Sequence, residues 1–66
     1  MARGKVKWFD VNKGYGFLSR DNGGYVFVHH SVIQGSEFKI LTKGQEVEFE
    51  VQEDLKLPIA IYVRPL

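Results

Sequence analysis

The sequence predicts an all-β fold, a small barrel of about five short strands. Three observations lead to this prediction. Turn signals rich in Gly, Asn and Asp recur at short intervals, the runs between them are rich in Val, Ile, Phe and Tyr, and no window keeps the spacing of an amphipathic helix. A chain of 66 residues is expected to form one domain, residues 1–66, around one core. Closing the strands into a barrel removes the exposed sheet edges that a small protein would otherwise present.

The first strand is predicted over Lys5–Asp10, ahead of a turn at Asn12–Gly14. Trp8 and Phe9 are adjacent, so they cannot share one face of a regular strand. Either a bulge or bend brings both rings near the surface, or one of the two rings belongs to the core.

The second and third strands are predicted over Tyr15–Arg20 and Tyr25–His29, joined by a tight hairpin at Asp21–Gly24. Asn and Gly tolerate the positive φ angles that such a turn requires. Because side chains alternate between the two faces of a strand, each strand divides into two sets. The expected core set is Gly16, Leu18, Val26 and Val28, and the set expected to face outward is Tyr15, Phe17, Phe27 and His29.

The rest of the chain is predicted to hold one short helical turn and two strands. Residues 31–41 are expected to hold one turn of helix or 3₁₀ helix, capped by Ser31, followed by a loop. The fourth strand is predicted over Glu46–Gln52, where glutamates that face water alternate with apolar residues, and the fifth over Ile59–Val63. The residues assigned to the core from these two strands are Val47, Phe49, Val51, Ile59, Ile61 and Val63.

The composition excludes several classes of protein. The chain has no cysteine, which rules out disulfides and cysteine-based zinc sites and makes a reducing, cytoplasmic location the expected one. No apolar run reaches the length of a membrane span, so no membrane partner is expected. The net charge is only +1, but residues 1–20 hold five basic residues against Asp10 (+4), and residues 21–66 hold four against seven carboxylates (−3). The positive segment is also rich in aromatic residues, which favours an anionic partner with rings.

Residues 13–18, KGYGFL, match the start of the RNP1 pattern of RNA-binding domains. Two aromatic residues two positions apart lie on one face of a strand, about 7 Å apart, where unstacked bases can rest against them. Phe27 and His29 on the neighbouring strand would extend this patch, and Lys13 would donate to a phosphate. The RNP1-like strand precedes its partner and no helices are visible, which excludes the α/β RNA-recognition fold. A five-stranded antiparallel Greek-key barrel of the oligonucleotide-binding (OB) type fits best, with an SH3-like barrel as the alternative.

The chain resembles the bacterial cold-shock proteins over nearly its whole length. The stretches that carry the resemblance are Gly4–Asp10, Lys13–Phe17, Val26–His29, Ser31, Ile33, Phe38–Leu41 and Gly44–Gln45. The resemblance implies binding of single-stranded RNA and DNA with low sequence specificity, without a cofactor. It also implies roles as an RNA chaperone and as a regulator of transcription or translation in a stress response. The positions that match the family's nucleic-acid contacts are Lys7, Trp8, Phe9, Lys13, Tyr15, Phe17, Phe27, His29 and Phe38.

The chain departs from the family's pattern at several positions. His30 stands where the family usually has Phe, Trp or Tyr, and Tyr25 stands where an acidic residue is common; both are kept as stacking candidates. Lys39 and Lys56 are added as candidate phosphate contacts. Residues 54–63 depart most, because Leu57 and Ile59 are apolar where Gly and Gln are expected. This segment would bring either extra core packing or a surface for a partner.

A small β-barrel protein-interaction module is the rival interpretation. The aromatic patch or the apolar Leu55–Ile59 segment would then dock a peptide, and self-association through that segment is an alternative to the expected monomer. No catalytic set is expected, since Ser31 has no acidic partner and no Walker loop is present. No metal site is expected either, because His29 and His30 are adjacent and lack a third ligand.

Overall fold

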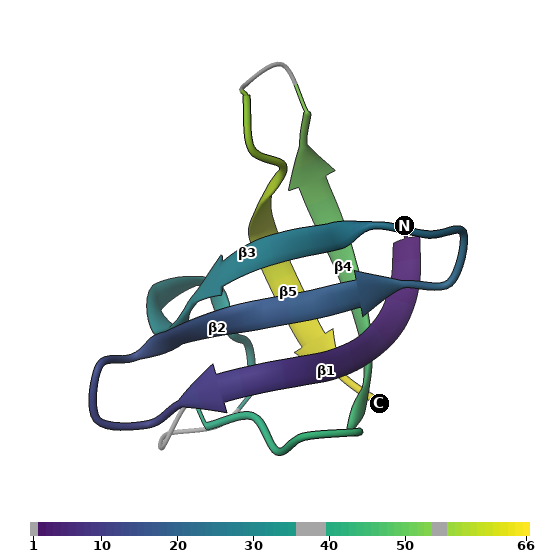
Figure 1. Cartoon of the computed structure of the whole chain (residues 1–66). Coiled ribbons are helices and arrows are strands. Elements are labelled where there is room, and N and C mark those ends of the chain that lie inside the picture. The colour runs from purple at the N-terminus through teal and green to yellow at the C-terminus, as the bar shows by residue number, and fades with distance from the viewer. Residues whose placement is uncertain (1, 36–39, 54–55) are drawn as a thin grey trace.

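The computed structural model describes residues 2–35, 40–53 and 56–66 (Figure 1). The elements in chain order are β1 (Ala2–Asp10), β2 (Tyr15–Arg20), β3 (Tyr25–His29), the 3₁₀ turn η1 (His30–Val32), β4 (Glu46–Gln52) and β5 (Ile59–Pro65). The all-β prediction is therefore confirmed. The predicted bounds of the second, third and fourth strands agree with β2, β3 and β4, while β1 begins earlier and β5 ends later than predicted.

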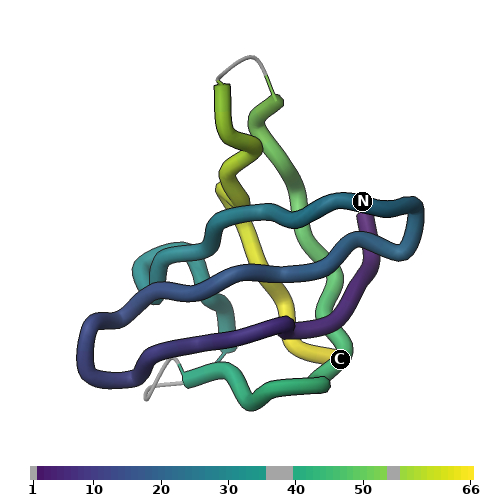
Figure 2. The backbone as a smooth tube through the Cα atoms, in the orientation of Figure 1, coloured from purple at the N-terminus to yellow at the C-terminus, as the bar shows by residue number. Residues whose placement is uncertain are grey.

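The strands close into a barrel in the order β1-β2-β3-β5-β4, with β4 pairing back onto β1. The first three strands form a meander, and β4 and β5 cross behind it at a steep angle (Figures 1 and 2). Four neighbouring pairs are antiparallel, as predicted, whereas β3 and β5 run parallel. A closed ring with an odd number of strands cannot alternate direction throughout, so one pair must be parallel. The predicted five-stranded barrel is confirmed, and β3–β5 is the parallel pair that closes it.

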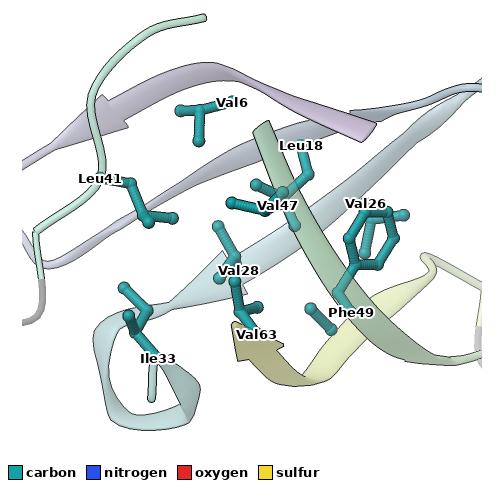
Figure 3. Packing of buried hydrophobic residues seen from close by; sticks show 10 residues of the cluster. Val6, Leu18, Val26, Val28, Ile33, Leu41, Val47, Phe49 and Val63 are labelled. Carbon is teal, nitrogen blue, oxygen red and sulfur yellow. The ribbon is translucent and has the colours of Figure 1, made fainter. Parts of the chain in front are cut away.

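The core is apolar, and no polar side chain is buried in the described part of the chain. Leu18, Val26 and Val28 are fully buried, so the faces of β2 and β3 are divided as predicted. Figure 3 shows the buried cluster, into which Phe49 projects from β4. Two buried residues, Ile33 and Leu41, come from the connection between η1 and β4, and Ile33 pairs with Val63 in an isolated bridge.

A bulge in β1 decides where its two large aromatic residues lie. Val6 pairs with Leu18 and Trp8 pairs with Phe17, so Lys7 is an extra residue without a partner on β2. The bulge reverses the inside–outside alternation beyond Lys7. Trp8 is exposed as a result, and Phe9 is half-buried and packs against the core. The structure thus combines parts of the two alternatives: β1 has a bulge, but the bulge separates the two rings, and Phe9 packs against the core.

A second bulge overturns part of the core assignment in β5. Glu50 pairs with Tyr62 and Val51 pairs with Ala60, which leaves Ile61 as the extra residue. The buried residues of β5 are consequently Ala60 and Val63. Ile61 is exposed, so its assignment to the core was wrong, and Ile59 is only half-buried. An extra residue shifts the two-residue period, and strict alternation then fails beyond it.

The predicted helical turn is present as η1, but its cap is not Ser31. His29 occupies the N-cap position in an extended conformation, and its side chain accepts a hydrogen bond from the Ser31 backbone N–H at 3.2 Å. An imidazole nitrogen therefore takes the place that a hydroxyl oxygen takes in common caps. This cap fixes the orientation of the His29 ring, which belongs to the candidate site described below.

An ion-pair triad spans the three strands β1, β4 and β5. Glu48 lies opposite Arg3 on one side and opposite Arg64 on the other, with N–O distances of 3.4 Å and 2.8 Å. The hydrogen bond from Arg64 lowers the pKa of Glu48 below its ordinary value; partial removal from water opposes this shift, and the charges of Arg64 and Arg3 add to it. Opposite charges directly across neighbouring strands stabilise the pairing of those strands.

Glu48→Gln is expected to lower the thermal unfolding midpoint at neutral pH. It should also reduce the further decrease of that midpoint as the pH falls. Because the pKa of Glu48 is lower in the folded state, its contribution is complete above the pKa of an unperturbed glutamate and is lost as pH falls through the lower, folded-state value. Circular dichroism melts at neutral and acidic pH measure both effects. Glu50→Gln is the control, since Glu50 is exposed on the same strand and has no ion pair within the described ranges. Identical pH profiles for Glu48→Gln and wild type would contradict the triad.

Candidate nucleic-acid interface

Four aromatic side chains form a continuous patch on the outer face of β1, β2 and β3, which we call the ring cluster: Trp8, Tyr15, Phe17 and Phe27. The ring centroids of Trp8 lie 5.9 Å from Tyr15 and 6.4 Å from Phe17. Those of Phe27 lie 5.7 Å from Tyr15 and 5.8 Å from Phe17. Each ring thus contacts two others, in the edge-to-face and tilted arrangements that aromatic pairs prefer. The cluster lies on the opposite side of β2 and β3 from the buried valines, so the barrel holds it in place.

Backbone pairing explains why these rings meet. Trp8 pairs with Phe17, and Phe17 pairs with Phe27, so the three side chains form a row across three strands. Gly16 permits the close approach of β2 to β1, because a Cβ atom there would lie 2.1 Å from the Trp8 carbonyl oxygen. The small residue on the inner side of β2 therefore supports the ring cluster on the outer side.

One end of the ring cluster opens into an apolar groove, which we call the Leu57 groove. Its lining residues are Lys7, Trp8, Phe17, Tyr25 and Leu57. The walls expose almost no polar surface, so Lys7 lines the groove with its aliphatic stem. The Phe27 N–H donates to the Pro58 carbonyl at 3.0 Å, which holds the segment before β5 against β3 and places Leu57 beside the rings.

The other end of the ring cluster carries two histidines. His29 pairs with Tyr15 across β2 and β3, and the rings of His29 and His30 lie 4.3 Å apart. Nδ1 of His29 lies 3.2 Å from the Ser31 backbone nitrogen and 2.9 Å from the Ser31 hydroxyl oxygen, so Ser31 holds the His29 ring in place. Both histidines are exposed.

A second hollow of about 230 Å³ lies beside His30. Its lining residues are Phe9, Val11, Asn12, Lys13, Gly14, His30 and Ile40. Gly14 has a positive φ of 78°, and a Cβ atom there would lie 2.5 Å from Cδ2 of His30. Any other residue at this position would therefore push His30 away from the turn between β1 and β2.

The arginines and lysines differ in whether their charges are paired with carboxylates. Arg3 and Arg64 pair with Glu48, and Arg20 pairs with Glu53 at 2.7 Å. Lys7 and Lys13 are exposed and pair with no carboxylate in residues 2–35, 40–53 and 56–66. The Asp10 carboxylate accepts from the backbone N–H groups of Asn12 and Lys13 at 2.9 Å and 3.0 Å and so shapes the turn. The positive charge available beside the rings therefore comes from lysines.

Most of the predicted site residues lie on this surface. The ring cluster, the Leu57 groove and the hollow beside His30 together contain Lys7, Trp8, Phe9, Lys13, Tyr15, Phe17, Tyr25, Phe27 and His30, and His29 lies between them. Lys56 is exposed next to Leu57 but lines neither hollow. Phe38 and Lys39 lie outside the described residues. Leu57 was not among the predicted site residues. The presence of an apolar residue where the resembled family has glycine could have indicated its place in the site.

The described residues were also searched for a metal site and for a membrane-spanning helix. Within the described ranges, no three His, Asp or Glu side chains come together as a metal site would require. No helix in the same part of the chain has the length and apolar character needed to span a bilayer.

Comparison with known proteins identifies similar chains. A family model described as "'Cold-shock' DNA-binding domain" matches residues 2–66. A "Cold shock-like protein" of Thermotoga maritima is 60% identical over 62 residues, which is 94% of each chain. A "Major cold shock protein" of Streptococcus pyogenes serotype M6 is 50% identical over 66 residues, covering 100% of this chain and 98% of the relative. "Cold shock protein CspB" of Bacillus caldolyticus is 52% identical over 63 residues, 96% of each chain.

A solved structure shows the same fold. The chain matches "drosophila Unr CSD456" with a TM-score of 0.79 and 23% identity, over 98% of its own length. It spans 26% of that longer chain.

Proposed function

Because the chain belongs to the cold-shock DNA-binding domain family, whose members bind nucleic acid, we propose that it binds single-stranded DNA and RNA by stacking bases on the ring cluster. The observation that carries the proposal is the outward-facing patch of four rings over three strands, in which each ring contacts two others. Every base has a flat face, so such a patch binds with low sequence specificity, and each stacked base contributes about 1–3 kcal/mol.

The proposal is limited to single strands for a geometric reason. In a duplex the flat faces of the bases are covered by their neighbours, whereas unpaired bases can turn onto an aromatic surface. Lys7 and Lys13, at the two ends of the cluster, would contact phosphates of the same strand. With a net charge of only +1, stacking rather than charge supplies most of the binding free energy.

Sequence-tolerant binding to unpaired strands suits an RNA chaperone, which keeps RNA from folding on itself, and a regulator of transcription or translation. We propose these roles for a cytoplasmic, monomeric protein acting through the single domain of residues 1–66. The rival interpretation, a protein-interaction module, is less favoured. Its two candidate docking surfaces, the aromatic patch and the apolar segment around Leu57, form one surface with the proposed base-stacking site. Leu57 lines the same groove as Trp8 and Phe17, and the family that matches the chain is a DNA-binding one.

Pyrimidine-rich single strands are expected to quench the fluorescence of Trp8, the chain's one tryptophan, whereas a duplex of the same sequence is not. Trp8 is 45% exposed, so a stacked base contacts its ring directly. Titration with matched single-stranded and duplex oligonucleotides measures this difference. Equal quenching by the duplex would refute stacking as the mode of binding.

A further inference from the structure

Two imidazole rings lie side by side at the end of the ring cluster away from the Leu57 groove. The rings of His29 and His30 are 4.3 Å apart and tilted by 36°, and both side chains are exposed. The His30 N–H donates to the Gly14 carbonyl at 2.8 Å, and Ser31 holds the His29 ring through Nδ1. Local hydrogen bonds therefore keep both histidines in place on the surface that is proposed to bind a strand.

Other charged and titratable groups lie around this pair. Lys13 lines the hollow beside His30 and pairs with no carboxylate in the described ranges. The Asp10 carboxylate lies in the same turn and accepts from two backbone N–H groups, which partly compensate its negative charge. Tyr15 pairs with His29 across β2 and β3. Of these side-chain types, only imidazole ordinarily changes its charge between about pH 5 and pH 8.

The hollow beside His30 offers hydrogen-bond donors to a small anion. The Lys13 ammonium group, the Asn12 amide and the His30 imidazole line it, and each can donate to a phosphate oxygen. Its volume of about 230 Å³ is below the range of sites for drug-sized ligands, which suits one phosphate group. A phosphate beside an imidazole favours the charged ring, because the opposite charge stabilises the protonated form.

We infer that the hollow beside His30 holds a phosphate of the bound strand and that His30 takes up a proton with it, so that single-strand affinity rises as the pH falls. The inference rests on the proposed function, since the strand must first stack on the ring cluster. The proton comes from the buffer and forms an N–H bond on the imidazole. Because the complex then holds more protons than the free protein and strand, lower pH favours the complex.

The geometry assigns the proton to His30 rather than to His29. Nδ1 of His29 accepts from the Ser31 N–H in the cap of η1, and a proton on this nitrogen would break that hydrogen bond. The His30 ring instead lines the hollow together with Lys13. Two adjacent imidazolium ions would also repel each other, so uptake of at most one proton is expected for each bound strand.

The test measures the affinity for oligodeoxythymidine at about pH 5.5 and about pH 8, the range over which histidine titrates. The probe carries no terminal phosphate, because a phosphate monoester would itself titrate there. Wild type should bind about fivefold more tightly at the lower pH, as one added exposed ion pair allows. His30→Gln should reduce this ratio below about twofold. Calorimetry in two buffers of different ionisation enthalpy measures the proton uptake, which His30→Gln should abolish.

Two further variants separate the position of the charge from its amount. His30→Lys carries a positive charge at both pH values, so it should bind more tightly than wild type at about pH 8 and lose most of the pH dependence. Lys43→Gln is the matched control, since it removes one positive charge from an exposed side chain that lines neither hollow. It should keep the wild-type ratio. Circular dichroism at both pH values checks that each variant is folded.

The failure of this inference can be distinguished from the failure of the proposed function. Equal wild-type affinity at both pH values would overturn the proton uptake and leave single-strand binding intact. A wild-type ratio in His30→Gln would also overturn it, because the proton would then bind elsewhere. An equal reduction of the ratio in Lys43→Gln would indicate an effect of net charge and contradict a site beside His30. If wild type binds the probe at neither pH, the proposed function fails and the inference fails with it.

Discussion

Phe17→Ala is expected to weaken binding of short single-stranded DNA by about fivefold to a hundredfold without unfolding the barrel. Phe17 is the middle ring of the row from Trp8 to Phe27, and it also lines the Leu57 groove. Its removal takes away one stacking surface and leaves a gap between the two remaining rings. The affinity is measured by titration on Trp8 fluorescence, and the fold is checked by circular dichroism.

The stability of Phe17→Ala should stay close to that of wild type because Phe17 lies outside the buried cluster. Ile61→Ala is the matched control: it also truncates a large apolar side chain outside the core, but Ile61 is on β5 and away from the rings. It should leave the affinity unchanged. Wild-type affinity in Phe17→Ala, or an equal loss in Ile61→Ala, would contradict the assignment of the interface to the ring cluster.

The strand pattern could be predicted because local chemistry determines it. The hairpin at Asp21–Gly24 shows this clearly: Gly23 and Gly24 have φ angles of 102° and 85°, and the Arg20 N–H donates to the Gly24 carbonyl. The division of β2 and β3 into buried and ring-bearing faces followed from the same two-residue period. Three of the four rings of the cluster could be assigned to the surface from that period alone.

The bulges mark the limit of that reasoning. Two adjacent aromatic residues, Trp8 and Phe9, made a bulge in β1 one of two alternatives, whereas nothing in the sequence around Ile61 indicates the bulge in β5. Ile59, Ile61 and Val63 alternate regularly, yet Ala60 is buried and Ile61 is exposed. The register between β4 and β5 decides this outcome, and register depends on contacts between segments rather than on the composition of one strand.

Contacts between distant segments account for the other differences. The tally of charges did not reveal that Arg3 and Arg64 share Glu48, because the three residues lie on three strands. Leu57 joins Trp8 only when β5 pairs with β3. Its apolar character was evident in the sequence, but its place in the interface depends on how the barrel closes.

Phe49→Ala is expected to have the largest effect on stability of any single truncation considered for this chain. Phe49 is fully buried, pairs with Ala2 on one side and Val63 on the other, and projects into the cluster shown in Figure 3. Truncating a buried phenylalanine costs about 3–5 kcal/mol, from lost burial and from the cavity that remains. The single core of a domain this small supplies a total stability of about 3–5 kcal/mol, so the variant should be largely unfolded or close to its midpoint at 25 °C.

The comparison with Phe17→Ala makes this expectation specific, because both variants lose the same atoms from opposite sides of the barrel wall. Phe49→Ala should lower the urea midpoint strongly, while its folded fraction, increased with an excluded osmolyte such as trimethylamine N-oxide, should bind single-stranded DNA as wild type does. Phe17→Ala should show the reverse, a normal midpoint and weak binding. If both variants lost stability and affinity together, the ring cluster would belong to the folding core, and stacking on it could not be separated from the integrity of the barrel.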